Sequence, residues 1–221
     1  MILTKINYFL TNKYMNKPHL ISTSTHMENP NRISEYVDSY KNVFKFKDLF
    51  ESLTIIETIS ETKLDYLENS GLDIYYSSLG NNHSNKGVNW LKHVTNFLTQ
   101  SKINDTDIVI FITGRYKMIN DNMFSLIEKH MITEKKEFIA KEDNDLYIGE
   151  LHGVHTFYMS FTKAKFIDFS NWYKTNGKPM DCIEWDVKRY LESNDKCLIL
   201  PKNIIMGVET KVFNSTNNKI C

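Results

Sequence analysis

The segment Asp107–Thr113, DIVIFIT, is the most continuously apolar stretch of the chain and constrains its fold more than any other feature. An unbroken apolar run of this length is typical of a strand that is covered on both faces. Such strands belong to sheets that carry helices on both sides. The run therefore predicts the central strand of an α/β sheet.

Strands and helices alternate along the chain before this strand. The predicted strands are His19–Thr25, Leu53–Ile59 and Leu72–Ser77. A helix is predicted from Pro30, with Ile33, Val37, Tyr40 and Phe44 on one face. A short helix is predicted over Thr62–Ser70. A third helix has a stripe of Val88, Leu91, Val94 and Leu98. This alternation predicts a single α/β domain with a mostly parallel sheet and helices on both faces.

The pattern becomes mixed after about residue 131. The predicted strands there are Glu137–Lys141, Leu146–Ile148, Thr156–Phe161, Cys197–Leu200 and Ile204–Val208, with helices Asn120–Met131, Lys163–Lys174 and Cys182–Glu192. The run Asp143-Asn144-Asp145 is typical of a hairpin turn, and a paired-carboxylate metal site is the alternative.

Charge and hydropathy exclude several classes of protein. The 27 cationic and 27 anionic residues give a net charge of +0, which argues against a dedicated nucleic-acid binder and against a polybasic membrane-associated protein. No apolar run reaches the roughly 20 residues that span a bilayer. Residues Met1–Leu20 lack the unbroken apolar run of a signal peptide, so we expect a cytoplasmic protein. The three cysteines have no CxxC spacing, which argues against a zinc site.

Ligands of such sheets bind outside the carboxyl ends of the strands, so the loops there hold the candidate site. Ser22, Thr23, Ser24 and Thr25 follow the first strand, where their hydroxyl groups could bind a nucleotide. The alternative is an ordinary hydroxyl-rich turn that caps a helix. Arg32, in the next helix, is either a phosphate contact or a solvated residue.

Two further loops carry cations. Lys86 and Gly87 open a helix whose N-terminus favours anions, although a solvated helix start is the alternative. Gly114, Arg115 and Tyr116 follow the central strand. Arg115 could pair with a phosphate and Tyr116 could stack on a base or sugar, and a structural arginine paired to a carboxylate is the alternative.

The second half of the chain contributes carboxylates and imidazoles. His152 and His155 could face a sugar or an acceptor, and a metal triad with Glu150 is less consistent with an extended segment. The candidate carboxylates at the start of the late helix are Asp181, Glu184 and Asp186. Glu184 or Asp181 could act as a general base, with Asp186 near the sugar or acceptor, and stabilisation of the helix N-terminus is the alternative.

The order of motifs resembles a known family. A first strand ending in STSTH is followed by NKG, TGRY, HGVHTFYMSF, IEWDVKRYL and IIMGVET. This succession resembles small nucleotide-sugar glycosyltransferases with a GT-A-like fold, of the kind that bacteria and large DNA viruses use to build surface glycans. The resemblance covers roughly residues 20–208. It implies an extension over residues 1–18 and one domain over 19–221, with a donor-binding half (about 19–131) and an acceptor half (about 132–210).

The resemblance implies hexosyl or pentosyl transfer from a nucleoside-diphosphate sugar, a UDP- or GDP-sugar, to a glycan hydroxyl. Most members carry Asp-x-Asp after the central strand to hold Mn²⁺ or Mg²⁺, whereas this chain has TGRYKM there. Metal dependence therefore stays open, and Arg115 with Lys117 could neutralise the leaving diphosphate instead.

Two other functions are considered. The missing Asp-x-Asp is compatible with a non-catalytic module that binds a nucleotide sugar or a glycan. A Rossmann-like methyltransferase is disfavoured because it requires a Gly-rich loop after the first strand, where this chain has STSTHMENP.

Overall fold

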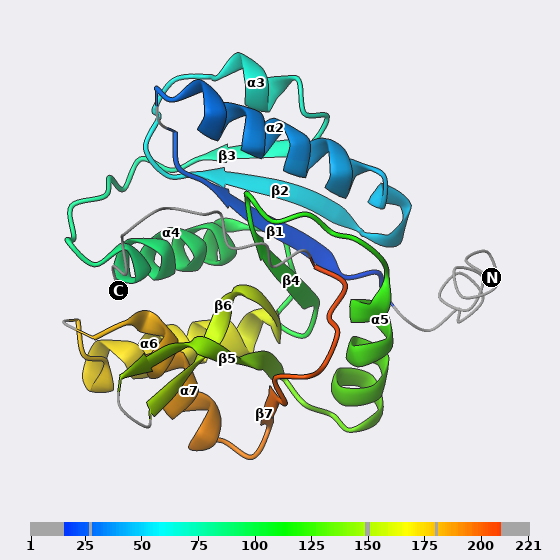
Figure 1. Cartoon of the computed structure of the whole chain (residues 1–221), viewed down its shortest axis with the longest axis vertical. Helices are drawn as coiled ribbons and strands as arrows, with labels where there is room; N and C mark the ends of the chain where they lie inside the picture. Colours follow the sequence, from blue (N-terminus) through cyan, green and yellow to red (C-terminus); the bar gives the residue numbers. More distant parts are fainter. Residues whose placement is uncertain (1–15, 27, 149–150, 180, 209–221) are drawn as a thin grey trace.

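The computed structural model describes residues 16–26, 28–148, 151–179 and 181–208. One seven-stranded sheet, in the order β3-β2-β1-β4-β6-β5-β7, forms the centre of the domain (Figure 1). The strands are β1 (His19–Ser24), β2 (Ser52–Glu57), β3 (Asp73–Tyr76), β4 (Ile108–Thr113), β5 (Phe138–Ile148), β6 (Leu151–Thr162) and β7 (Cys197–Leu200). The apolar run of β4 occupies the middle of the sheet, as its sequence predicts.

The first four strands are parallel, and the order in which they are added to the sheet reverses at β1. It runs outward from β1 to β2 and β3 and then returns to place β4 on the other side of β1. The connecting helices are α2 (Pro30–Phe44), α3 (Asp65–Glu68) and α4 (Lys86–Gln100), with a short 3₁₀ turn at Lys47–Leu49. Because such connections are right-handed, the reversal places α2 and α4 on opposite faces of the sheet (Figure 1).

The second half adds the antiparallel part of the sheet. β6 pairs antiparallel with β4 and with β5, and β7 lies parallel to β5 at the edge. The remaining helices are α5 (Asn122–Leu126), which continues as a π-helical segment (Ile127–Thr133), α6 (Lys163–Asn176) and α7 (Ile183–Glu192).

Three predicted details of the elements are wrong. β5 continues through residues 143–145, so no hairpin turn forms there, and its register with β6 shifts between Glu142 and Tyr147. Pairing along a long hairpin therefore overrides the turn preference of Asp and Asn. Residues 204–208 contribute only a bridge between Val208 and Met118. The face that α2 buries is Tyr36, Ser39, Tyr40 and Val43, so of the predicted face only Tyr40 is buried.

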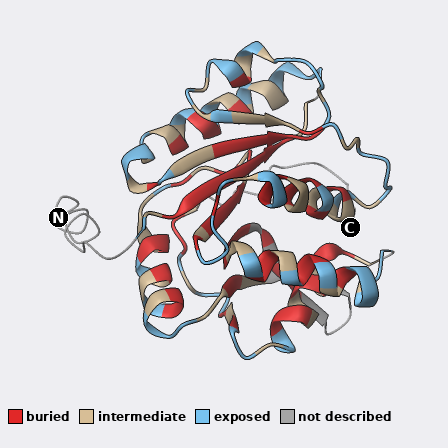
Figure 2. Ribbon diagram, turned by 180° about the vertical axis from the view of Figure 1, so that it is seen from behind, coloured by how far each residue is buried: buried red, intermediate tan, exposed pale blue. Residues whose placement is uncertain are grey.

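The core lies in layers on the two faces of the sheet (Figure 2). Ile21 and Phe111 pack with α4, α6 and α7 on one face. Leu20 and Ile110 belong to the core on the other face. Aromatic rings fill much of the first layer, where Phe161 and Phe166 have ring centroids 4.5 Å apart. This layered core covers both faces of the central strands.

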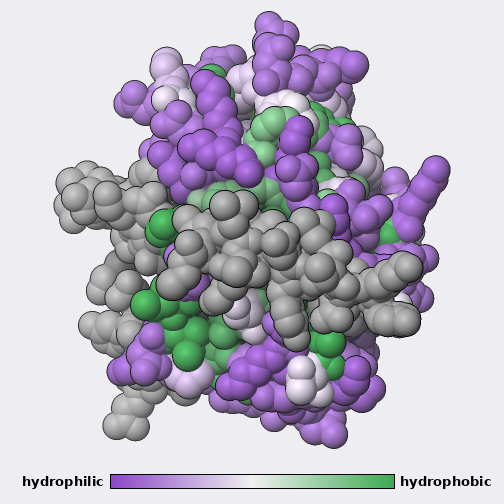
Figure 3. All heavy atoms as spheres, turned by 90° about the vertical axis from the view of Figure 1, so that its right-hand side faces the viewer, coloured by the Kyte–Doolittle hydropathy of each residue, from purple (hydrophilic) through white to green (hydrophobic). Residues whose placement is uncertain are grey.

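One face of the molecule is mainly hydrophilic in its described part. Figure 3, which shows the side that carries α5, has hydrophilic residues over most of the part that is not grey. The exposed large hydrophobic residues among those described are Ile59, Ile119 and Ile205. None of the described helices combines the length and the apolar character that a membrane crossing needs.

We expect that Gly114→Ala destabilises the fold, because the added methyl group has no space. A Cβ at this position would lie 2.7 Å from the Tyr40 hydroxyl and closer still to the backbone carbonyl of Thr23. We expect a loss of about 1–3 kcal/mol in the free energy of unfolding, measured by urea titration. Tyr40→Phe serves as the background control: it removes the hydroxyl but not the carbonyl, so the loss should persist there. An unchanged midpoint in Gly114→Ala would contradict this close packing of β1 and β4.

Candidate functional site

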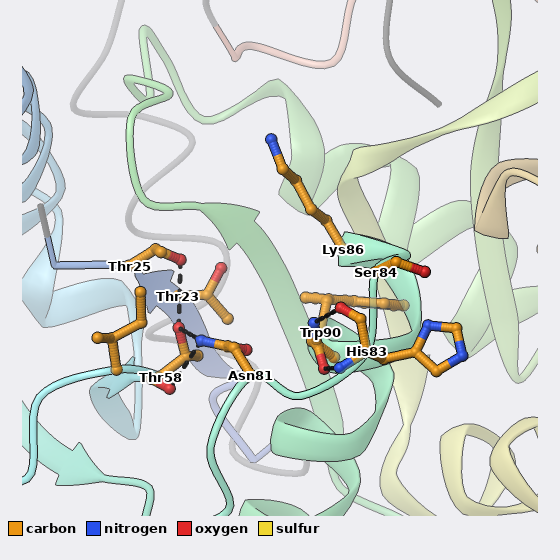
Figure 4. Close-up of a pocket in the computed structure, with 10 residues that line it drawn as sticks. Thr23, Thr25, Thr58, Asn81, His83, Ser84, Lys86 and Trp90 are labelled. Carbon is orange, nitrogen blue, oxygen red and sulfur yellow. Dashed lines mark hydrogen bonds between the residues drawn. The ribbon is translucent and has the colours of Figure 1, made fainter.

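A cavity of about 330 Å³ opens at the carboxyl ends of β1 and β2 (Figure 4). Its lining residues are Thr23, Thr25, Thr58, Ile59, Asn81, His83, Ser84, Lys86, Asn89 and Trp90. They come from the ends of two parallel strands, from the loop before α4 and from the first turns of α4. Among the described residues, the lining combines hydroxyl and amide groups with one ammonium group, an imidazole, an indole and one aliphatic side chain, and it includes no carboxylate. This is the edge of the sheet where ligands of α/β proteins bind.

The predicted hydroxyl residues of β1 and the residue after it alternate between the two faces of the sheet. Thr23 and Thr25 line the cavity, whereas Ser22 and Ser24 alternate to the opposite face and are buried. The Ser24 hydroxyl lies 3.5 Å from the hydroxyl of Tyr66, which belongs to α3 on that opposite face. The structure therefore places two of the four hydroxyl residues at positions 22–25 at the cavity.

Hydrogen bonds join the cavity walls that come from different loops. The Thr58 hydroxyl lies 3.2 Å from the Thr25 hydroxyl and donates to the Ser24 carbonyl at 3.0 Å. The amide of Asn81 donates to the Thr58 carbonyl at 2.9 Å. The loops after β1, β2 and β3 thus meet at Thr58, and the wall is held in one arrangement.

A buried carboxylate holds the backbone of this cavity wall in place. Glu57 is fully buried at the end of β2, and its Oε1 accepts three backbone N–H groups, from His26 at 3.1 Å, Ile59 at 2.8 Å and Ser60 at 3.1 Å. Hydrogen bonds from backbone N–H groups to a carboxylate are stronger than those between neutral groups. Glu57 therefore holds the loops after β1 and β2 in position.

The loop before α4 is held by two polar side chains of that helix. The fully buried ring of His93 places Nδ1 2.7 Å from the Ser77 hydroxyl and Nε2 3.0 Å from Asn81 Oδ1. Asn89 accepts the His83 N–H at 3.2 Å and donates to the His83 carbonyl at 2.6 Å. Side chains of α4 therefore bond to polar groups of Ser77, Asn81 and His83 in the loop that precedes the helix.

The N-terminus of α4 is joined to the start of α7. Asn85 caps α4 by accepting the Gly87 N–H at 2.8 Å, and its amide donates to the Asp181 carbonyl at 2.6 Å. A Cβ on Gly87 would lie 2.5 Å from Cβ of Ile183. Gly87 therefore permits close packing of the two helices, while Lys86 beside it extends over the cavity rim (Figure 4).

The three candidate carboxylates at α7 have different environments. Glu184 is half-buried, and its Oε1 accepts the Thr156 hydroxyl of β6 at 2.9 Å. Asp181 is partly exposed and lies 3.5 Å from Arg189. Asp186 is fully buried and pairs with the same arginine. Burial raises the pKa of the Asp186 carboxyl above its ordinary value, although the Lys178 N–H and Arg189 oppose that shift.

Most of the predicted cations lie away from the cavity lining. Arg32 and Arg115 approach the same oxygen of Glu35, at 3.9 and 3.7 Å. Lys117 lies 3.8 Å from Asp38 in an exposed ion pair. Of these four predicted phosphate-binding cations, Lys86 lines the cavity, whereas Arg32 and Arg115 lie beside Glu35 and Lys117 lies beside Asp38.

The neighbours of Arg115 have packing roles. The Tyr116 side chain is buried in the core and does not line the cavity. The Tyr116 carbonyl accepts the Ser39 hydroxyl at 2.6 Å. Gly114 donates its N–H to the Thr23 carbonyl at 3.2 Å, which joins the ends of β4 and β1. The glycine is required for this close approach.

The segment after β4 does not fit a divalent metal. It offers Arg115 and Lys117 where Mg²⁺ or Mn²⁺ would need carboxylate oxygens. Within the described residues, no three His, Cys, Asp or Glu side chains gather in a metal-binding group. The backbones of His152 and His155 belong to β6, and their side chains lie outside the described part of the chain, as do those of residues 143–145.

Several lining residues were not predicted from the sequence. These are Thr58, Ile59, Asn81, His83, Ser84, Asn89 and Trp90. Thr58 and Ile59 directly follow β2. The rule that ligands bind outside the carboxyl ends of parallel strands, which pointed to the loop after β1, could therefore have found them. Asn89 and Trp90 carry no such signal, because their positions on α4 resemble those of any helix that packs on a sheet.

Comparisons with known proteins identify the fold. No protein-family model and no curated protein sequence matches the chain. The 2-C-methyl-D-erythritol 4-phosphate cytidylyltransferase (IspD) of Francisella tularensis superposes with a TM-score of 0.50 and 10% identity, over 86% of this chain and 93% of that chain. A 4-diphosphocytidyl-2C-methyl-D-erythritol synthase gives a TM-score of 0.50 and 10% identity, over 86% and 90%.

A glycosyltransferase has the same arrangement. GlyE of Streptococcus pneumoniae TIGR4 superposes with a TM-score of 0.52 and 10% identity, over 84% of this chain and 45% of that chain. The chain therefore has the GT-A-like fold that nucleotidyltransferases and glycosyltransferases share, and the predicted fold class is confirmed. At this level of identity the likeness shows the fold alone.

We expect that acid loosens the loop before α4 through His93. Burial, and then the charge of Lys92, lower the pKa of His93 below its ordinary 6.5. Below about pH 6.5 the unfolded chain therefore binds a proton that the folded chain does not, and stability falls as the pH falls. The urea midpoint should drop between about pH 7.5 and pH 5.5 by more in the native protein than in His93→Gln, which keeps a donor for Asn81. Equal drops would show that His93 does not cause the effect.

Proposed function

We propose that the protein is a glycosyltransferase that uses a nucleoside-diphosphate sugar, a UDP- or GDP-sugar, and transfers the sugar to a hydroxyl group of a glycan. The observation that carries this proposal is the cavity at the carboxyl ends of β1 and β2, with Lys86 on its rim. In this proposal residues 19–131 bind the donor and residues 132–210 bind the acceptor.

The chemistry of the cavity lining supports binding of a nucleotide. Hydroxyl groups of Thr23 and Thr25 and the amide of Asn81 offer hydrogen bonds to a base and a ribose, and Trp90 offers an aromatic face. The volume of about 330 Å³ lies at the lower end of the range for small-molecule sites. Lys86 and the N-terminus of α4 provide positive charge for the phosphates.

Glu184 is the proposed general base. Thr156 donates to Oε1 of Glu184, and the start of α7 is joined to the cavity wall through Asn85. The carboxylate would take the proton of the acceptor hydroxyl while the oxygen of that hydroxyl bonds to the anomeric carbon of the donor sugar. The bond from that carbon to the phosphate oxygen breaks, and Lys86 would stabilise the departing diphosphate. Asp181, which pairs with Arg189, is the alternative base.

The alternation along β1 supplies a matched test of nucleotide binding. Thr23→Val removes a hydroxyl from the cavity with little change in volume, and Ser22→Ala removes one from the opposite face. We expect Thr23→Val to weaken UDP or GDP binding by about 3- to 10-fold, the effect of one neutral hydrogen bond, measured by isothermal titration calorimetry. Ser22→Ala should bind like the native protein. Equal affinities in all three proteins would place the nucleotide elsewhere.

For Glu184→Gln, we expect turnover to fall by at least about 100-fold while nucleotide affinity stays within about 2-fold. Glutamine keeps an acceptor for Thr156 but cannot take a proton. Release of UDP or GDP from the nucleotide sugar reports turnover, and calorimetry reports binding. Asp181→Asn is the comparison, and a larger loss there would make Asp181 the base. Loss of binding in Glu184→Gln would assign Glu184 a structural role.

A second candidate activity is nucleotidyl transfer. The cytidylyltransferase structure matches over 93% of its own length, compared with 45% for GlyE. A nucleotidyltransferase would release pyrophosphate from a nucleoside triphosphate and a sugar phosphate, whereas a glycosyltransferase would release a nucleoside diphosphate from a nucleotide sugar. Binding of nucleotides with neither product would instead support a non-catalytic binding module.

A further inference from the structure

The side chain of Asn85 joins two parts of the chain that are far apart in the sequence. Its Oδ1 accepts the Gly87 N–H at 2.8 Å, which caps α4. Its amide nitrogen donates to the Pro179 carbonyl at 3.0 Å and to the Asp181 carbonyl at 2.6 Å. An amide group carries two N–H hydrogens, so each carbonyl can receive one. Both polar atoms of this side chain are therefore used, and two of the bonds lead to the segment before α7.

Capping alone does not require asparagine at position 85. Serine, threonine, aspartate and asparagine all cap helices well. An ionised aspartate has no hydrogen to donate, and a serine or threonine hydroxyl has only one. Of these four residues, only asparagine can accept the N–H of the helix and donate to two carbonyls at the same time. The amide group therefore indicates a role in joining the two segments.

The segment that Asn85 binds is in turn fixed to α7. Asp186 of α7 accepts the Lys178 N–H at 3.3 Å, so the residues just before the helix are held to it. The starts of the two helices are also packed together, because a Cβ on Gly87 would lie 2.5 Å from Cβ of Ile183. A shift of the segment before α7 would therefore move the start of the helix as well.

This link connects the cavity with the proposed general base. Ser84 and Lys86, on either side of Asn85, line the cavity. Glu184 lies in the first turn of α7, and Thr156 of β6 donates to its Oε1 at 2.9 Å. Thr156 thus orients the carboxyl group, whereas Asn85 holds the helix that carries it.

We propose that Asn85 is a positioning residue for the transfer step: its two amide hydrogen bonds hold the start of α7, and with it Glu184, in a fixed place relative to the cavity. This inference rests on the proposed function, because it takes the cavity as the donor site and Glu184 as the base. Removing the amide should lower turnover and leave nucleotide binding nearly unchanged, because a misplacement of about 1 Å can cost about 100-fold in rate.

A matched pair of substitutions separates the link from the cap. Asn85→Ser keeps an oxygen that can accept the Gly87 N–H, adds no charge at the cavity rim, and places no group at the positions of the two amide hydrogens. Asn29→Ser is the control, because Asn29 caps α2, another helix of 15 residues, by accepting the N–H groups of Asn31 and Arg32. Among the described residues, the Asn29 amide donates no hydrogen bond. Only Asn85→Ser therefore removes a link between two segments.

Turnover and binding are measured on the full-length chain, below the melting temperature of each variant. Release of UDP or GDP from a panel of UDP- and GDP-sugars reports turnover, with water in place of the glycan hydroxyl. Calorimetry with UDP and GDP reports binding. We expect Asn85→Ser to lower turnover by about 10- to 100-fold while nucleotide affinity stays within about 2-fold. Asn29→Ser should match the native protein in both measurements.

A double-mutant cycle tests whether Asn85 acts through Glu184. In a Glu184→Gln background no base remains to be positioned, so we expect Asn85→Ser to lower the residual turnover by less than about 2-fold. A further loss of about 10- to 100-fold in that background would show that Asn85 does not act through Glu184.

Two other outcomes would also overturn the inference. Native turnover in Asn85→Ser would show that the transfer step does not need the link. Equal losses of turnover and nucleotide affinity would show that Asn85 shapes the cavity and does not position α7. The proposed function fails separately, if the native protein releases no UDP or GDP from the panel or if Glu184→Gln keeps native turnover. Both of these results are obtained without any change at Asn85.

Discussion

The change at β1 in the side of the sheet on which new strands are added is the constraint on which the rest of the structure depends. β1 pairs with β2 on one side and with β4 on the other, and both pairings are parallel. Right-handed connections then force α2 and α4 onto opposite faces of the sheet. The loops that lead into these helices diverge at the carboxyl edge, and the cavity lies where they diverge. With all helices on one face, the loops would not separate in this way.

Buried carboxylates keep the loops around this edge in place. Glu57 accepts three backbone N–H groups from the loops after β1 and β2, and Asp186 accepts the Lys178 N–H in the segment before α7. Both side chains are fully buried, and the described bonds of both carboxyl groups are made within the fold. Asn85 then joins the loop before α4 to the segment before α7. The cavity lining is therefore held in one arrangement by the fold itself, and a lining that is already ordered would lower the cost of binding the proposed nucleotide.

The sequence predicts the fold better than the site, for physical reasons. Apolar runs such as Asp107–Thr113 mark buried strands because covering both faces requires continuous apolar residues. Paired strands overrode the turn preference of residues 143–145, because sheet pairing depends on partners that local sequence does not show. Arg115 follows β4 as predicted but approaches Glu35, which lies on another element. The rule for strand ends points to the loop that contains Asn81 and His83, but it does not show which residues of that loop line the cavity.

The opposite orientation of neighbouring side chains along β1 has an evolutionary consequence. Substitutions at residues 23 and 25 change the groups that line the cavity, whereas those at residues 22 and 24 change packing beneath α2 and α3. One short strand therefore contains two sets of positions that selection can act on separately. The cavity lining can therefore diverge among descendants of this chain while they inherit the same sheet.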